Sequence, residues 1–200
     1  IIGMIFALMN VSRNRVLNLI GTVYVDAVRG VPLIVLAFFI YFGVPSGIQQ
    51  LGKSFDIAAF QQFRLTALQG GTIALAMNCG AYMAEIIRAG IQSVDKGQIE
   101  AGRSLGFNYV QTMVHFIVPQ AFKAILPSLA NEFISLLKES SVAFAIGLGD
   151  LTFGGNLIRS TTYSPFLPLL AVAVIYLILV MILSKLVSLL ERRLAKSDRG

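Results

Sequence analysis

The sequence predicts an all-α protein that spans a membrane, with five transmembrane helices of which the first is truncated. Of the 200 residues, 56% are hydrophobic and only 13% are charged, whereas soluble domains carry about 25% charged residues. The apolar residues are also gathered into long blocks, and a lipid bilayer is the natural solvent for such blocks. We therefore expect a single transmembrane domain over residues 1–200.

Five apolar blocks supply these helices. The first, residues 1–11, is shorter than the roughly 20 residues that cross a bilayer core of about 30 Å, so we expect the sequence to begin partway through a first helix. The next two are residues 27–44 and residues 63–89, which are long but only moderately apolar. Residues 127–146 and 165–190 complete the set, and the last block is the most lipid-like.

The distribution of lysine and arginine predicts the orientation, because cytoplasmic connections carry an excess of both. One side of the predicted bundle carries Arg13, Arg15, Arg29, Arg88, Lys96, Arg103, Lys123, Arg192, Arg193, Lys196 and Arg199. The opposite side carries only Lys53, Arg64 and Arg159. The first side should be cytoplasmic, which places the N-terminus outside and the C-terminus inside.

Several classes of function lack the residues that they need. The net charge is +6, but the basic residues sit at the ends of apolar blocks and are not interleaved with aromatic side chains, which argues against nucleic-acid binding. Cys79 and His115 are the only cysteine and histidine, so an intrachain disulfide and a His/Cys metal site are excluded. The sequence contains no Ser/His/Asp or Cys/His constellation, and we expect no catalytic residue.

The stretch "GIQQLGKS", residues 47–54, matches the phosphate-loop pattern G-x-x-x-x-G-K-[ST]. A working phosphate loop follows a buried strand and opens a helix whose N-terminus binds the phosphates. Here the preceding apolar run is long enough to span a membrane, and the orientation places the stretch in an outer loop. The match is therefore interpreted as accidental.

The predicted cytoplasmic segment of residues 93–119 contains a short helix. Asp95 can cap the helix N-terminus, with Gln98 at the capping-box position, and Gly106 is suited to end the helix in a left-handed conformation. These signals predict a helix over residues 96–105, about 15 Å long at 1.5 Å per residue. Taken alone, such a segment is equally consistent with a helix lying at the membrane interface.

This segment resembles a known signature. "EAGRSLG" at residues 100–106, followed by "FIVP" at 116–119, is similar to the EAA motif, E-A-A-x3-G-x9-I-x-L-P, of binding-protein-dependent ABC importer permeases. Glu100, Ala101 and Gly106 match at the right spacing, and Pro119 falls where the final proline belongs.

Three positions depart from the signature, since Gly102, Phe116 and Val118 replace its second alanine, its isoleucine and its leucine. Glycine at the third position is familiar in the polar amino-acid branch of the family. Other stretches that resemble this branch are "RGVPLIVLAFFIYFGVP", "NCGAYMAEIIRAGIQSVDKGQIEAG" and "KESSVAFAIGLGDLT". The resemblance covers nearly the whole chain, from about Val25 to "LERRL".

The resemblance implies a five-helix permease domain that hydrolyses no ATP itself. A separate cytoplasmic ABC ATPase dimer would bind ATP and Mg²⁺, and a second permease copy or homologue and an extracytoplasmic amino-acid-binding protein would complete the importer. The EAA segment would form a coupling helix docked on the ATPase and able to pass its rigid-body motion to the membrane helices. The implied coupling residues are Glu100, Ala101, Gly102 and Gly106.

Two predicted helices carry polar faces. Residues spaced by three and four positions share one face of a helix. The helix predicted at residues 63–89 has such a face with Gly71, Leu75, Asn78, Tyr82 and Glu85. The helix predicted at residues 127–146 has a similar stripe with Ser128, Glu132, Ser135 and Glu139, and Lys138 is adjacent to it. Polar side chains are costly in lipid, so the set predicts a translocation path, while hydrogen bonding between helices is the alternative for each residue. The residues expected along the path are Leu68, Thr72, Asn78, Tyr82, Glu85, Glu139, Ser140 and Ser141.

The resemblance implies a polar amino acid as the substrate, and three acids favour a cationic one such as arginine, lysine or histidine. Glu85, Glu132 and Glu139 lie in or near membrane helices, where an unpaired charge is costly and often functional. Arg88 and Lys138 are close in sequence and could satisfy two of these acids internally.

Other classes of membrane protein fit the sequence less well. A secondary transporter or channel would show internal repeats or broken half-helices, and the two halves of the sequence show no repeat. A scaffold protein would not need polar stripes in two helices.

Overall fold

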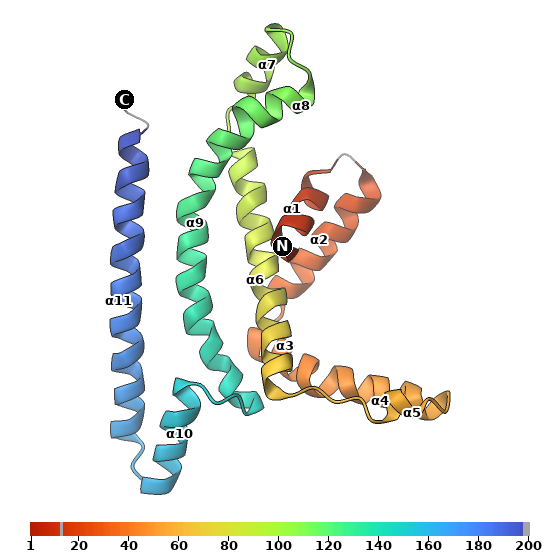
Figure 1. Cartoon of the computed structure of the whole chain (residues 1–200), viewed down its shortest axis with the longest axis vertical. Coiled ribbons are helices and arrows are strands. Elements are labelled where there is room, and N and C mark those ends of the chain that lie inside the picture. Colours follow the sequence, from red (N-terminus) through yellow and green to blue (C-terminus); the bar gives the residue numbers. More distant parts are fainter. Residues whose placement is uncertain (13, 198–200) are drawn as a thin grey trace. The chain divides into compact units, whose positions relative to one another are not determined.

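The structure is a computed structural model that describes residues 1–12 and 14–197. Every regular element in these residues is helical, which confirms the all-α prediction (Figure 1). The elements are α1 (Ile2–Val11), α2 (Arg15–Gly30), α3 (Leu33–Phe38), η1 (Phe39–Gly43), α4 (Val44–Ser54), α5 (Ala58–Gln61), α6 (Ala67–Gln92), α7 (Lys96–Ser104), α8 (Tyr109–Thr112), η2 (Met113–Ile117), α9 (Val118–Glu139), η3 (Ser140–Ile146), α10 (Leu151–Thr162) and α11 (Phe166–Ser197). Arg13 and Arg199, both used to predict the orientation, lie outside the described residues.

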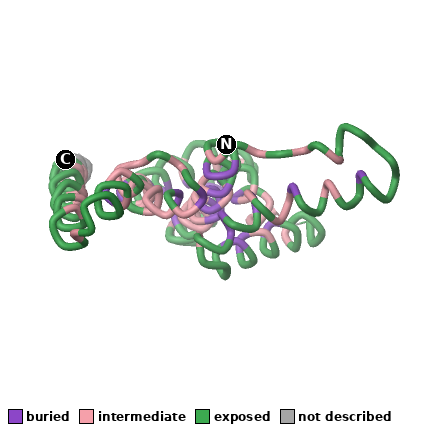
Figure 2. Tube along the Cα trace, turned by 90° about the horizontal axis from the view of Figure 1, so that it is seen from below, coloured by how far each residue is buried: buried purple, intermediate pink, exposed green. Residues whose placement is uncertain are grey.

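Three helical runs in the described residues are long and apolar enough to cross a membrane. They are Leu33–Ser54, Tyr109–Ile146 and Phe166–Leu189, with 22, 38 and 24 residues. α1 is apolar but shorter, and α6 has the length, with 26 residues, but falls outside this set. The number of spanning helices therefore stays a prediction. Exposed residues predominate along the trace (Figure 2), and the most apolar stretch of α11 is not buried at all within the chain, as a lipid-facing helix requires.

The second predicted helix, residues 27–44, has different bounds in the structure. α2 ends at Gly30, and a new helical run starts at Leu33 and continues to Ser54. Proline disfavours the helical conformation in the residue before it, here Val31, so α2 cannot continue through this point. Pro32 itself has an extended ψ of 137° and caps the next helix. The block of residues 27–44, which was predicted as one helix, therefore contains the end of α2 and the beginning of the run that starts at Leu33.

Two five-residue π-helical segments stand directly before prolines. η1 ends two residues before Pro45, and η2 ends two residues before Pro119. A proline inside a helix lacks an N–H, and its ring clashes with the carbonyl four residues earlier. The wider π turn moves that carbonyl away, so both helical runs continue through their prolines.

The fourth predicted helix was expected to begin at Pro127, but this proline lies inside α9. The helical run that contains it starts at Tyr109. Two further helices, α2 and α10, were not predicted because their apolar residues lie on one face and form no long block. α10 begins at an N-cap, where Asp150 Oδ1 accepts a hydrogen bond from the Phe153 N–H at 2.7 Å.

Contacts divide the chain into two compact units. The first contains the described residues of Ile1–Asp26, Cys79–Ile134 and Ile182–Gly200. Its core includes the buried Ala7, Val25 and Ala84, and Phe6 stacks on Tyr24 with ring centroids 3.7 Å apart. Close helix approach depends on small residues, since a Cβ added at Gly3 would lie only 2.6 Å from Met83 Cβ.

The second unit contains Ala27–Asn78 and Ser135–Met181. Small residues again allow the helices to approach each other: a Cβ at Gly70 would lie 2.9 Å from Tyr41 Cδ2, and one at Gly71 would touch Ile146 and Ala143 of η3. α6 therefore presents glycines to both η1 and η3 in this unit.

Candidate functional site

The short helix predicted at residues 96–105 is confirmed as α7, and its ends are formed as expected. The Gly97 N–H donates to Asp95 Oδ1 at 2.7 Å, which satisfies one of the free donors of the first turn. Gly106 has a φ of +87°, and the Phe107 N–H donates to the Gly102 carbonyl at 3.1 Å. A left-handed glycine followed by this bond closes the helix sharply.

The predicted role of Gln98 in a capping box at Asp95 is wrong. Gln98 Oε1 instead accepts a bond from Gln120 Nε2 at 3.3 Å. A capping box forms at the next helix, where Asn108 and Gln111 exchange bonds of 2.9 and 3.0 Å. The signal for it, N-x-x-Q after a left-handed glycine, is present in the sequence and was missed.

α7 packs tightly against the start of the helical run that begins at Tyr109, and we call this contact the clamp. Gly102 is buried, and a Cβ there would lie 2.7 Å from Cγ2 of Thr112, a fully buried residue. Phe107 packs edge-on against Phe116 with ring centroids 5.3 Å apart. Gly102 and Phe116 are two of the departures from the EAA motif, and both are explained by this clamp. The close approach that Gly102 permits is to Thr112, within the chain.

The clamp leaves one face of α7 open. Glu100 and Ala101 are exposed, as is Arg103. These side chains lie on a short rigid helix whose other side is occupied by Thr112. The exposed face can therefore accept an external surface without loosening the helix.

In the second unit the structure brings together Asn78 and Glu139, two of the residues predicted on the path. Asn78 Nδ2 donates to Glu139 Oε2 at 2.9 Å, and Asn78 is only 4% exposed. Gly71, Ala74 and Asn78 form one buried face of α6. The stripe is thus a packing face that carries one polar interhelical bond, and Glu139 has a partner other than the adjacent Lys138.

Other predicted path residues are placed differently. Leu68 is 64% exposed and Thr72 is also exposed, so neither lies on the buried face of Asn78. The hydroxyls of Ser140 and Ser141 donate to the carbonyls of Leu137 and Lys138 at 2.7 and 2.6 Å. These serines keep only their acceptor capacity for a ligand.

Glu85 and the half-buried Tyr82 belong to the first unit. Arg88 donates to Glu85 from Nε at 2.9 Å and from Nη2 at 2.5 Å. This bidentate geometry is the strong form of the arginine–carboxylate pair. Glu85 is therefore satisfied internally, which is the alternative that the sequence left open.

The "GIQQLGKS" stretch lies in α4, so its expected position in a loop is wrong. Its backbone groups are engaged in a helix instead of forming the open cradle that binds phosphate. Gly52 is buried where α5 folds back, and its carbonyl accepts from the Ile57 N–H at 2.8 Å. A Cβ at Gly52 would lie 2.7 Å from the Gln61 nitrogen. The second glycine of the pattern thus serves helix packing.

Three apolar helical runs of bilayer length, together with a short clamped helix that has an open polar face and precedes one of these runs, are features of a multi-pass membrane protein of the transporter class. The chain belongs to the family of binding-protein-dependent transport system inner membrane components, whose family model matches residues 1–196. The resemblance seen in the EAA segment is thereby confirmed, as is the permease fold.

Relatives and solved structures agree with this family. The chain is 41% identical over 197 residues to the probable glutamine ABC transporter permease protein GlnM of Bacillus subtilis (strain 168), covering 98% of this chain and 85% of the relative. It is 37% identical over 198 residues to the arginine transport system permease protein ArtQ of the same organism, covering 99% and 84%. A crystal structure of an amino acid ABC transporter with histidines superposes with a TM-score of 0.85 at 44% identity, over 96% of this chain and 83% of that chain. The MetNI methionine ABC transporter, at 18% identity with a TM-score of 0.73 over 96% and 84%, shares the fold.

Proposed function

We propose that this chain is the permease subunit of an ATP-driven importer of polar amino acids, and that residues 1–200 form its single permease domain. The observation that best supports this proposal is the geometry of α7, which lies within the proposed coupling segment at about residues 93–119. α7 is a short helix clamped through Gly102 and Thr112, with Glu100 and Ala101 exposed. A rigid helix of this kind transmits a rigid-body motion of a docked partner to the run that begins at Tyr109.

The partner at α7 is a cytoplasmic ABC ATPase dimer, which binds ATP and Mg²⁺ and carries out the hydrolysis. A second permease copy or homologue completes the path, and an extracytoplasmic binding protein delivers the substrate. The side of Arg15, Arg29 and Arg103 is cytoplasmic, with the N-terminus outside and the C-terminus inside. A secondary transporter or channel would have no use for the open face of α7.

The substrate is a polar amino acid, because relatives of this chain are named for glutamine and for arginine. Among the path residues, Glu139 is the acid we assign to a cationic side chain, since Glu85 is paired with Arg88. Asn78, through its bond to Glu139, holds that carboxylate in place. Leu68, Thr72, Tyr82, Ser140 and Ser141 complete the proposed path.

The test is uptake by proteoliposomes that contain the permease, its ATPase and its binding protein. Labelled arginine and glutamine should accumulate only when ATP is supplied on the side of the membrane that carries the ATPase. Arginine, lysine and histidine should compete best. Stronger competition by glutamine or glutamate would refute the cationic preference, and accumulation of neither labelled amino acid would refute the substrate class.

A further inference from the structure

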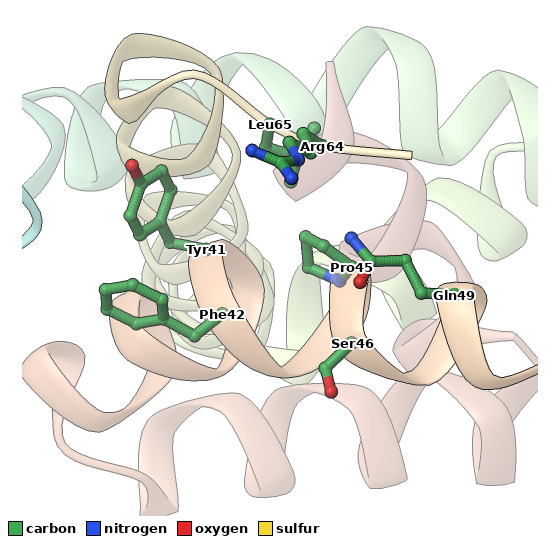
Figure 3. Close-up of a pocket in the computed structure, with 7 residues that line it drawn as sticks. All are labelled: Tyr41, Phe42, Pro45, Ser46, Gln49, Arg64 and Leu65. Carbon is green, nitrogen blue, oxygen red and sulfur yellow. The ribbon is translucent and has the colours of Figure 1, made fainter. Parts of the chain in front are cut away.

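An open hollow of about 360 Å³ lies beside the middle and the C-terminal half of the first bilayer-length run, Leu33–Ser54 (Figure 3). It is lined by Tyr41, Phe42, Pro45, Ser46, Gln49, Arg64 and Leu65, all in the second unit. The segment with Arg64 and Leu65 lies across the hollow from the helix that carries Tyr41, Pro45 and Gln49. Its volume falls in the range of roughly 300–1,000 Å³ typical of small-molecule sites.

Arg64 is the one charged group among the described residues that line this hollow. None of the described residues forms an ion pair with it. Its guanidinium therefore presents its donors to whatever occupies the hollow. Arginine binds planar anions through two parallel hydrogen bonds, and carboxylates match that geometry.

The backbone on both sides of Arg64 is fixed. On the N-terminal side, Gln49 Nε2 donates to the Phe63 carbonyl at 2.8 Å, which ties the segment to α4. On the C-terminal side, Thr66 and Gln69 exchange bonds of 2.9 and 3.2 Å in a capping box at the start of α6. Gly70 then packs against Tyr41. These ties fix the backbone that carries Arg64 beside the hollow before any ligand arrives, which lowers the cost of binding.

We propose that the hollow is a carboxylate-binding site, with Arg64 pairing the α-carboxylate of a free amino acid at the outer mouth of the path. This inference rests on the proposed function and its orientation. Tyr41 and Leu65 supply apolar walls for the body of the ligand, and the open side leaves its side chain in water. Such a site would select for the carboxylate that all amino acids share, before any selection by side chain. An acidic side chain of the binding protein is the other source of the same chemistry.

The experiment uses the complex of permease and ATPase in nanodiscs without binding protein, with labelled glutamine and arginine as probes in equilibrium dialysis. Arg64→Gln should weaken the binding of both amino acids by about tenfold or more, since it removes a charge-assisted pair. Arg64→Lys should retain part of the affinity, because it keeps the charge and loses the fork. Lys53→Gln, which removes a positive charge of α4 that does not line the hollow, should leave binding unchanged. The wild-type complex should bind the carboxamide forms of both probes at least as weakly as Arg64→Gln binds the acids.

A second arm measures the concentration of binding protein that half-maximally stimulates ATP hydrolysis. If Arg64→Gln raises only this concentration, the carboxylate site stands and its ligand is an acidic side chain of the binding protein. If neither measurement changes in Arg64→Gln, or if Lys53→Gln has the same effect, the inference is overturned. ATP-driven uptake by the wild-type complex is measured in parallel. If the wild-type complex shows no uptake, the proposed function is refuted. If uptake is normal but Arg64→Gln changes neither amino-acid binding nor stimulation by the binding protein, only this site is refuted.

Discussion

Replacing Gly102 by alanine places a methyl group where Thr112 already lies. The added Cβ would be 2.7 Å from Thr112 Cγ2 and 2.9 Å from its Oγ1, and Thr112 is 0% exposed. Overpacking a filled site costs about 1–3 kcal/mol, whereas alanine is favoured over glycine in a helix by about 1 kcal/mol. Gly102→Ala should therefore destabilise α7 by on the order of 1 kcal/mol.

The sign of this effect should reverse when Thr112 is shortened. In the Thr112→Ala background the nearest remaining atom is the Cβ at 3.4 Å, an ordinary contact. Gly102→Ala should then stabilise α7 by up to about 1 kcal/mol, because only the helix preference remains. Thr112→Ala alone measures the combined loss of the buried Cγ2 methyl group and of the bond from Thr112 Oγ1 to the Asn108 carbonyl at 3.0 Å.

Hydrogen exchange of the amides at residues 101–107 reports the free energy of opening of α7. It is measured in the wild type, in Gly102→Ala, in Thr112→Ala and in the double variant. Gly47→Ala is the control for a glycine with open space around it, and it should leave exchange in α7 unchanged. Effects of Gly102→Ala that have the same sign in both backgrounds, and add within about 0.5 kcal/mol, would show that the two residues do not press on each other.

Three further predictions follow from the described contacts. The isolated chain should not bind ATP, because "GIQQLGKS" is helical; saturable nucleotide binding that Lys53→Ala abolishes would contradict this. Glu100→Ala and Gly106→Pro should each uncouple ATP hydrolysis from uptake while the helical content stays unchanged, since proline cannot adopt the φ of +87° at Gly106; normal uptake by both variants would exclude the coupling role. Asn78→Leu should lower the free energy of unfolding by on the order of 1–3 kcal/mol because Glu139 loses its donor, and adding Glu139→Leu should restore most of it in thermal unfolding of the complex; a double variant as unstable as the single one would refute this account.

Local signals in the sequence are sufficient to predict where α7 begins and ends. An N-cap aspartate and a left-handed glycine act within one turn, so Asp95 and Gly106 predicted both ends of the helix to within a residue. The apolar blocks likewise predicted where long helices lie. The bounds are less accurate because a proline in a sequence predicts the end of a helix, whereas the π turns before Pro45 and Pro119 allow the helices to continue.

Partners distant in sequence could not be predicted from spacing. Asn78 and Glu139 were placed on separate faces of separate helices, and only packing pairs them across 61 positions. The clamp of Gly102 on Thr112 and the fold of α5 against Gly52 depend in the same way on tertiary approach. Periodicity identifies a face of a helix, but the neighbour that covers that face is set by the whole fold.

Coupling through α7 is tested most directly by the number of amino acids accumulated per ATP hydrolysed in proteoliposomes that contain the complete complex, with proteoliposomes that lack the ATPase subunit for comparison. We expect a fixed ratio in the complete complex and no accumulation when the ATPase is omitted. When Glu100 and Gly106 are replaced and the ATPase is present, we expect hydrolysis to continue without accumulation. Accumulation by the permease alone, driven by an ion gradient and independent of ATP, would contradict the assignment of this chain as an importer subunit coupled through α7.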